Sequence, residues 1–297
     1  MTGVEITCDR QDGLIRAAVW QGKVLRDLYL DRLDRPDLTG AILRGKIVRV
    51  LADPHAFFVE GGLTETIRVQ SAEKYRTGDI VTLRIQSAAR QGKAWTGVLT
   101  RDESDDKTIG ILAPPPPPWQ RALEDLKTLP PAALHFSDRA DHAACQAWLA
   151  LHAPKVLPAV QLAKTPVHPD LDDWMDALNH PSVPLPHGGS LVIETTEALT
   201  VLDINGGEAS NTLAFNLLAV KEAARQIRWR NLAGIIILDA LKMKQREDKA
   251  KIINALARAT ADDPAGVQVF GLTKLGLLEI VRTRRGPSLA ESLHDRN

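Results

Sequence analysis

Two aspartates, Asp203 and Asp239, have the residue type and setting that best suit chemistry. Each stands at the end of an apolar run typical of a strand, LTVLDI for Asp203 and GIIILD for Asp239. If the two strands are neighbours, both carboxylates lie at the carboxyl edge of a sheet, where α/β proteins bind ligands. A hard cation such as Mg²⁺ takes one or two carboxylates together with waters and phosphate oxygens. Asn205, two residues after Asp203, could orient that carboxylate by a hydrogen bond.

Simpler interpretations of the same residues stay open. An aspartate after a strand is often a turn former or a helix N-cap, and Asp203 stands in the string Asp-Ile-Asn-Gly-Gly. A glycine turn after an aspartate also occurs in sugar-kinase-like and actin-like ATPases, but those folds need a second such turn, and none follows Asp239. The patterns GxxxxGK[ST], GxSxG and HExxH are absent.

Charge is unevenly distributed along the chain. The 37 basic and 37 acidic residues cancel, which argues against a protein that coats nucleic acid by bulk charge. Residues 221–285 are nevertheless rich in lysine and arginine. They could form a phosphate-binding face, and a salt-bridged helix surface is the alternative. The residues that could contact the phosphate backbone of a nucleic acid are the basic segment 221–230, Lys242, Lys244, Arg282 and Arg284.

Residues 39–100 are predicted to form a small β-barrel. Five candidate strands separated by glycine turns, in roughly 60 residues, are typical of an OB-fold. Aromatic side chains on such a barrel can stack on bases while a lysine contacts phosphate, which makes Lys46, Phe57 and Phe58 candidates. Because adjacent strand residues face opposite sides, one phenylalanine should be buried and the other free.

The remaining elements predict an α/β protein. The first 33 residues read as a three-stranded meander with turns at Asp12-Gly13 and Gln21-Gly22. Residues 114–118 are five prolines, which favour a stiff spacer. Helices and strands then alternate, including a short strand near 155–160 and a helix capped by Asp138. The apolar run 234–241 predicts a central strand covered on both faces.

The sequence also indicates the cellular compartment in which the protein works. No apolar run reaches the roughly 18 residues of a membrane-spanning helix, and the start lacks a secretory signal pattern. Cys8 and Cys145 form no CxxC pair, which predicts buried or half-exposed thiols in a reducing cytoplasm. The histidines share no metal-ligand spacing.

Several stretches resemble the ribonuclease E/G family. They are SLVIETTEALTVLDING, AARQIRWRNLAGIIILDALKM and VQVFGLTKLGLLEIVRTRRGPSLAES, with EITCDRQDGLIRAAVWQGKVLRDLYLDR and RGKIVRVLADPHAFFVEGG nearer the start. The resemblance implies magnesium bound by Asp203 and Asp239, with Asn205 in support. It also implies an endonuclease that cuts single-stranded, often AU-rich RNA to leave a 5′-phosphate and a 3′-hydroxyl, in RNA processing or decay.

The resemblance further implies an RNase H-like subdomain with an inserted OB-fold, followed by a DNase I-like catalytic subdomain. The expected division is residues 1–37 and 119–186 for the RNase H-like part, 38–103 for the OB-fold, 104–118 for a proline-rich linker and 187–297 for the catalytic part.

Departures from the family pattern modify these expectations. The loop after Asn205 is the short GGEASNT, Lys242 stands where an acidic residue is usual, and TETIRVQ replaces an HGFLP-like string in the barrel. The Arg-Thr pair that senses a 5′-monophosphate is not recognisable, so cutting is expected not to depend on the 5′ end. The zinc-binding cysteine pair is missing, so we expect a monomer or homodimer and no zinc-linked tetramer. A catalytically inactive RNA-binding relative is the alternative.

Overall fold

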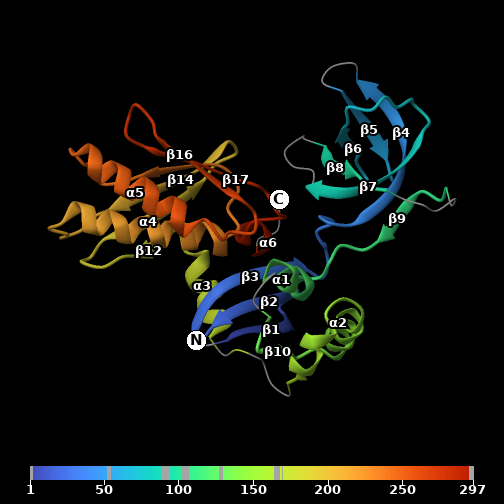
Figure 1. Ribbon diagram of the computed structural model, residues 1–297, viewed down its shortest axis with the longest axis horizontal. Helices are drawn as coiled ribbons and strands as arrows, with labels where there is room; N and C mark the ends of the chain where they lie inside the picture. The colour runs from blue at the N-terminus through green and yellow to red at the C-terminus, as the bar shows by residue number, and fades with distance from the viewer. Residues whose placement is uncertain are drawn as a thin grey trace. The chain divides into compact units, whose positions relative to one another are not determined.

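The protein is described by a computed structural model that covers residues 3–51, 55–87, 94–101, 107–126, 130–163, 168 and 170–293. The chain divides into two compact units (Figure 1). One unit comprises residues 1–30 and 122–297, and the other comprises residues 31–121. The second unit is therefore an insertion in the chain of the first.

A mixed five-stranded sheet opens the first unit, in the order β11-β10-β1-β2-β3. The strands β1, β2 and β3, which are consecutive in the chain, form the predicted meander. Asp12 and Gly13 both have positive φ angles, 50° and 76°, as a tight hairpin turn requires. β10 pairs in parallel with β1, and β11 with β10. The strands are β1 Val4–Gln11, β2 Leu14–Gln21, β3 Val24–Arg32, β10 Ala133–Phe136 and β11 Val160–Leu162.

Helices alternate with these strands, as the sequence predicts. Asp138 caps the second helix by accepting hydrogen bonds from the backbone N–H groups of Ala140 and Asp141. The strand expected near 155–160 is wrong for most of its length, because residues 154–159 form a 3₁₀ helix, η1. Pro154 and Pro158 have no N–H to donate to a sheet ladder, so β11 begins only after them. The helices are α1 Pro118–Leu126, α2 Arg139–His152, η1 Pro154–Ala159 and α3 Leu171–Asn179.

A six-stranded sheet forms the C-terminal part of the same unit, in the order β12-β13-β14-β15-β17-β16. β14 and β15 are parallel to each other, and the other pairings given are antiparallel. β12 and β17 were not predicted. The strands are β12 Ser182–Pro184, β13 Ser190–Thr195, β14 Leu199–Asn205, β15 Gly234–Asp239, β16 Val267–Leu272 and β17 Leu278–Arg282, and the helices are α4 Thr212–Trp229, α5 Arg246–Ala259 and α6 Leu289–Leu293.

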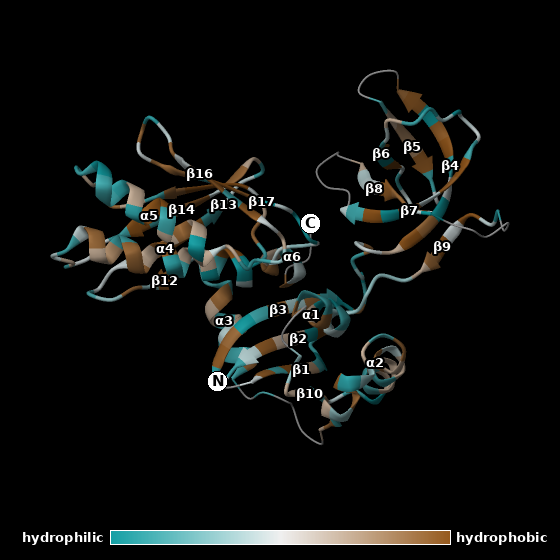
Figure 2. Cartoon of the chain, viewed as in Figure 1, coloured by the Kyte–Doolittle hydropathy of each residue, from teal (hydrophilic) through white to brown (hydrophobic). Residues whose placement is uncertain are grey.

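Helices α4 and α5 pack on one face of this sheet (Figure 1). The core includes Leu202 and Ile204 of β14, Ile236 and Leu238 of β15, and Phe215 of α4, each at most 4% exposed. Figure 2 shows strands that are mostly hydrophobic, and helices α4 and α5 that mix hydrophilic and hydrophobic residues.

The expected coverage of β15 on both faces is wrong. Ile235, which alternates with the buried Ile236, is 51% exposed, and Asp239 is exposed as well. An apolar run of isoleucines therefore does not require two covered faces here. The sheet keeps one open face.

Arg228, Trp229 and Arg230 tie the end of the predicted basic segment 221–230 to other elements of the first unit. Arg228 of α4 donates to Asp27 of β3, with one contact at 2.8 Å, and the Trp229 indole donates to the backbone oxygen of Arg26. Arg230 donates to Gln226 and to the His180 backbone oxygen, and burial lowers its pKa to about 10. The C-terminal half of segment 221–230 therefore supports packing and is not a free phosphate-binding face.

Strands of the second unit close into a barrel. β4, β5, β6, β8 and β7 pair in a ring, because β5 and β7 both bond to β4. β6 and β8 are parallel, and the other ring pairings are antiparallel. This closed five-stranded barrel is OB-like. β9 adds to β4 and was not predicted. The strands are β4 Ile42–Leu51, β5 Ala56–Glu60, β6 Ile67–Gln70, β7 Ile80–Ser87, β8 Trp95–Leu99 and β9 Gly110–Ala113.

Smaller features bear on other expectations. Of the five prolines, the last, Pro118, opens α1, where a missing N–H costs nothing.

Cys8 and Cys145 are free and buried, and burial raises the pKa of the Cys145 thiol to about 12, so both serve packing. Within the ranges given above, no helix is long and apolar enough to cross a membrane.

A buried ion pair gives the fold its first test. Asp263 binds Arg282 through two contacts, at 2.9 and 3.2 Å, and their side chains are 2% and 4% exposed. Asp263→Ala leaves the guanidinium buried without its counter-charge and should lower the free energy of unfolding by about 3–5 kcal/mol. Asp262→Ala is the matched control, because that side chain is 64% exposed, and it should cost under about 1 kcal/mol. Equal losses in urea unfolding would contradict the assignment.

Candidate metal centre and nucleic-acid interface

Asp203 and Asp239 are direct neighbours across the parallel pair β14–β15. Their Cα atoms are register partners, as are those of Leu202 and Leu238 one residue earlier. Adjacent parallel strands in register present paired residues on the same face of the sheet. The structure thus brings together the two carboxylates that the sequence places at separate strand ends.

Alternation along the strands decides which face carries them. Leu202 and Ile204 are 0% and 4% exposed beneath the helices, so Asp203 between them points to the open face. Leu238 is likewise buried, and Asp239 follows it on the open side. Both carboxylates are exposed and can exchange water for a ligand.

Asn205 lies on the same face as Asp203, two residues along β14. Its side-chain amide nitrogen donates to the Asp203 carboxylate oxygen Oδ2 over 3.2 Å. This is the contact the sequence predicted. Such a hydrogen bond orients the carboxylate that accepts it.

The segments after the two strands are held against one another. Asn216 of α4 is fully buried, and its amide donates to the Leu241 backbone oxygen at 2.9 Å while accepting from the Leu241 N–H at 3.1 Å. A Cβ on Gly206 would lie 2.8 Å from the Leu241 side chain. Gly207 has φ +54°, and a Cβ there would lie 2.4 Å from the His187 backbone oxygen. Sequence reasoning missed Asn216, because an asparagine inside a helix carries no motif.

The donor set fits a hard divalent cation. Two exposed carboxylates side by side, one of them oriented by an amide, offer oxygen ligands and room for water and phosphate oxygens. Among the described residues, no group of three or more His, Cys, Asp and Glu side chains could hold a metal ion. A hard ion such as Mg²⁺ needs only one or two protein carboxylates, with waters and phosphate oxygens as its other ligands.

Two further carboxylates share the open face, and the sequence reasoning did not select them. Glu279 of β17 is the register partner of Ile237. Glu194 of β13 is the partner of Val201. Both are exposed. They add negative potential to the face that carries Asp203 and Asp239, which favours a cation.

The cations predicted near the site differ in their accessibility. Lys242 and Lys244 follow β15 directly and are exposed. Arg284 is partly buried and lies 3.6 Å from Glu291. The prediction that Arg282 contacts phosphate is wrong. Its guanidinium is buried against Asp263 and also donates to the Leu232 backbone oxygen at 3.0 Å. Arg282 therefore has no access to a ligand at the surface.

The barrel presents an aromatic side chain between two arginines. Arg49 of β4, Phe58 of β5 and Arg68 of β6 are successive register partners. The Arg49 guanidinium lies 5.9 Å from the centre of the Phe58 ring. Phe57 faces inward at 3% exposure and packs against Tyr75, which confirms that one phenylalanine is buried and identifies which. Lys46 is exposed on β4 opposite Glu60.

The row Arg49, Phe58 and Arg68 is well suited to single-stranded nucleic acid. A base can stack on the ring, and each guanidinium can take a phosphate or stack on a base in turn. The sequence reasoning missed both arginines. Only the strand register, with an irregularity between Ile47 and Arg49, brings Arg49 beside Phe58.

Comparison with known proteins assigns the chain to a family. The sequence profile of the ribonuclease E/G family matches residues 77–285. The chain therefore belongs to the ribonuclease E/G family. This result confirms the resemblance seen in the sequence.

Curated relatives match a shorter region. Ribonuclease E of Nostoc is 40% identical over 122 residues, which are 39% of this chain and 18% of that protein. Ribonuclease E of Escherichia coli is 40% identical over 135 residues, 43% of this chain and 13% of that protein. The chloroplastic ribonuclease E/G-like protein of Arabidopsis thaliana is 36% identical over 129 residues, 40% of this chain and 13% of that protein. The matched region is thus less than a fifth of each relative.

Asn216 provides the test of how the site is positioned. Asn216→Leu keeps the volume but leaves the N–H and C=O of Leu241 without their partner, which should cost about 2 kcal/mol of unfolding free energy. The Leu241 amide should also exchange with deuterium faster than in the wild type. Asn254→Leu, at an exposed position on α5, is the control. Unchanged exchange at Leu241 in Asn216→Leu would rule out the positioning role.

Proposed function

We propose that the protein is a magnesium-dependent endoribonuclease. It cuts single-stranded RNA at internal phosphodiester bonds, in RNA processing or decay. The observation that carries the proposal is the register pairing of Asp203 with Asp239 on the open face of the C-terminal sheet. Membership of the ribonuclease E/G family supports it. The products would be a 5′-phosphate and a 3′-hydroxyl.

Each residue of the site has a separate role in this proposal. Asp203 and Asp239 would hold the magnesium ion, and Asn205 would keep the Asp203 carboxylate in its binding orientation. The bound ion would supply charge neutralisation at the phosphodiester and activate water. Lys242 and Lys244, just beyond β15, would bind phosphates next to the cleaved one, with Arg284 as a further contact.

The barrel would bind RNA by stacking. Phe58 would take a base on its ring, while Lys46 and the arginines beside Phe58 would contact the backbone. Phe57 would contribute only by filling the core that holds Phe58 outward. This division of roles replaces the expectation that either phenylalanine contacts RNA.

The subdomain assignments also belong to the proposal. The mixed sheet of β1, β2, β3, β10 and β11, interrupted in the chain by the barrel, supports an RNase H-like part. The six-stranded sheet under α4 and α5 supports a DNase I-like part. The division at residues 37, 103, 118 and 186 stays a prediction. Two further expectations also stay predictions: a monomer or homodimer without a zinc link, and cutting that does not depend on the 5′ end of the RNA.

A second candidate is a catalytically inactive RNA-binding protein with the same fold. The short segment after Asn205 and the exposed Lys242 beside the carboxylates favour it. The aligned carboxylates favour the enzyme, because a purely binding site for a polyanion gains nothing from two adjacent negative charges.

Conservative variants of the two aspartates separate these candidates. Asp203→Asn and Asp239→Asn keep the shape and remove a metal-binding charge. Internal cutting of a 5′-labelled, AU-rich single-stranded RNA in Mg²⁺ should fall roughly 100-fold or more, and EDTA should abolish it in the wild type. RNA affinity should stay within a few-fold.

Asp176→Asn, an exposed carboxamide change on α3, is the matched control and should cut normally. Full cutting by Asp239→Asn would discard the metal site. Tight binding by the wild type without cutting of several RNAs would favour the inactive relative.

Phe58 provides the test of the barrel. Phe58→Ala removes the stacking surface and should weaken single-stranded RNA binding by about 1–3 kcal/mol. Val98→Ala, which truncates an apolar residue 43% exposed on β8, should leave affinity unchanged. Fluorescence anisotropy with a labelled RNA measures both, and equal affinity for the two variants would contradict the stacking role.

A further inference from the structure

A groove lies between α4 and α5, on the side of the sheet opposite Asp203 and Asp239. Its volume is about 520 Å³. The lining contains two cations, one amide and three apolar side chains, and no carboxylate: Leu217, Lys251, Asn254, Ala257, Arg258 and Ala261. None of these residues was selected by the sequence reasoning.

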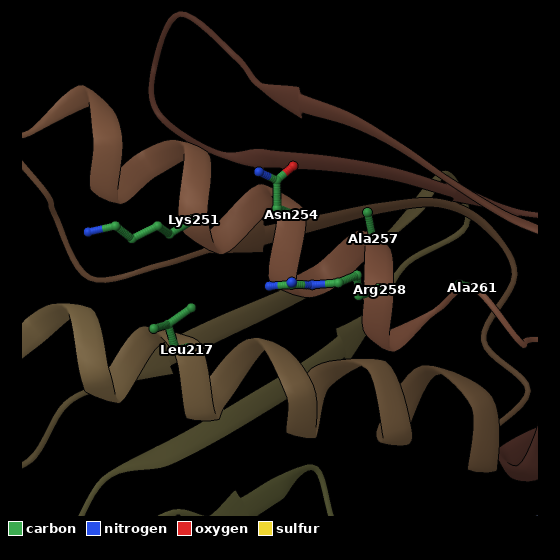
Figure 3. Close-up of a pocket in the computed structure, with 6 residues that line it drawn as sticks. All are labelled: Leu217, Lys251, Asn254, Ala257, Arg258 and Ala261. Atoms are coloured by element: carbon green, nitrogen blue, oxygen red, sulfur yellow. The ribbon is translucent and has the colours of Figure 1, made fainter.

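The two cations extend in the same direction along the groove. Figure 3 shows Lys251 and Arg258 leaving α5 and reaching toward its N-terminal end, with Arg258 next to the space above Leu217 of α4. They are seven positions apart on α5, so their attachment points lie about 10 Å apart along the helix axis. Two phosphates of a flexible single strand can span such a separation.

Arg258 differs from several other arginines of the C-terminal region. Arg228, Arg282 and Arg285 are each bound by a carboxylate, and the first two are largely buried. Arg258 is exposed and, among the described residues, has no carboxylate within ion-pair distance. Its position in the last turn of α5 suits a cation, since the helix dipole is negative there, but leaves the guanidinium donors for a ligand.

Lys251 has a partner that a ligand can replace. Its ammonium lies 2.9 Å from Asp248 one turn earlier, and the two side chains are 56% and 26% exposed. Exposed pairs of this kind contribute little free energy, so exchanging the carboxylate for a phosphate costs little. The lining also contains the apolar side chains of Leu217 and Ala257, which could contact a base of the bound strand.

We propose that this groove is a further RNA-binding site, besides the cutting site and the barrel, which holds the phosphates of a single strand on the far side of the sheet from the cutting site. The inference rests on the proposed function, because RNA is taken as the occupant. The open face carries Asp203, Asp239, Glu194 and Glu279 and repels RNA wherever no cation is bound. The groove would hold an RNA segment that extends beyond that face.

The test is RNA binding in EDTA, so that cutting does not enter. The double variant Lys251→Gln, Arg258→Gln keeps helix-forming side chains and removes both charges. For a single-stranded RNA of about 30 nucleotides, each lost phosphate contact should lower the salt slope by about 0.7. The slope of log Kd against log salt should therefore fall by about 1.4, and affinity in 0.1 M salt should fall roughly 10- to 25-fold.

The matched control is Arg139→Gln, Lys155→Gln, which removes the same two charge types from exposed positions on α2 and η1. Its slope and affinity should equal those of the wild type. Equal changes in both double variants would mean a general charge effect and overturn the groove site. Unchanged binding by the groove variant alone would also overturn it, while the proposed function stands. A wild type that binds no RNA would overturn both.

Discussion

The parallel register between β14 and β15 is the constraint on which the proposed site depends. Leu202 and Ile204 of β14 and Ile236 and Leu238 of β15 are buried on the helix-covered face, in the core that includes residues of α4 and α5. Alternation then leaves Asp203 and Asp239 on the open face, side by side. Like charges placed directly opposite one another destabilise a sheet. The core thus places two like charges side by side, and the proposed cation would relieve their repulsion.

Charges in the C-terminal region divide into two groups with different physical roles. Buried arginines, such as Arg228 with Asp27 and Arg282 with Asp263, hold elements distant in the chain together. Removing one partner of such a pair is costly, so these residues are not available to a ligand. Lysines and arginines that face solvent, such as Lys242 and Arg258, are the ones that remain for phosphates. Segment composition alone could not separate the two groups.

Much of the fold could be predicted because local signals agree with the tertiary structure. The helix capped by Asp138, the meander turns and the five barrel strands all follow from spacing and turn residues. Short strands such as β12 and β17 lacked such signals. The exposure of β15 on one face was not predicted, because a run of isoleucines has the same sequence pattern whether one face of the strand or both faces are covered. The neighbours of Phe58 and the partners of Asn216 depend on long-range register, which a single sequence does not specify.

The central claim is that Asp203 and Asp239 together bind a divalent cation. Mn²⁺ titration followed by electron paramagnetic resonance measures this directly, without RNA and without cutting. The wild type should bind one Mn²⁺ that Mg²⁺ displaces, and both Asp203→Asn and Asp239→Asn should lose that site while Asp176→Asn keeps it. Binding of the same ion, with the same affinity, by either site variant would contradict the account.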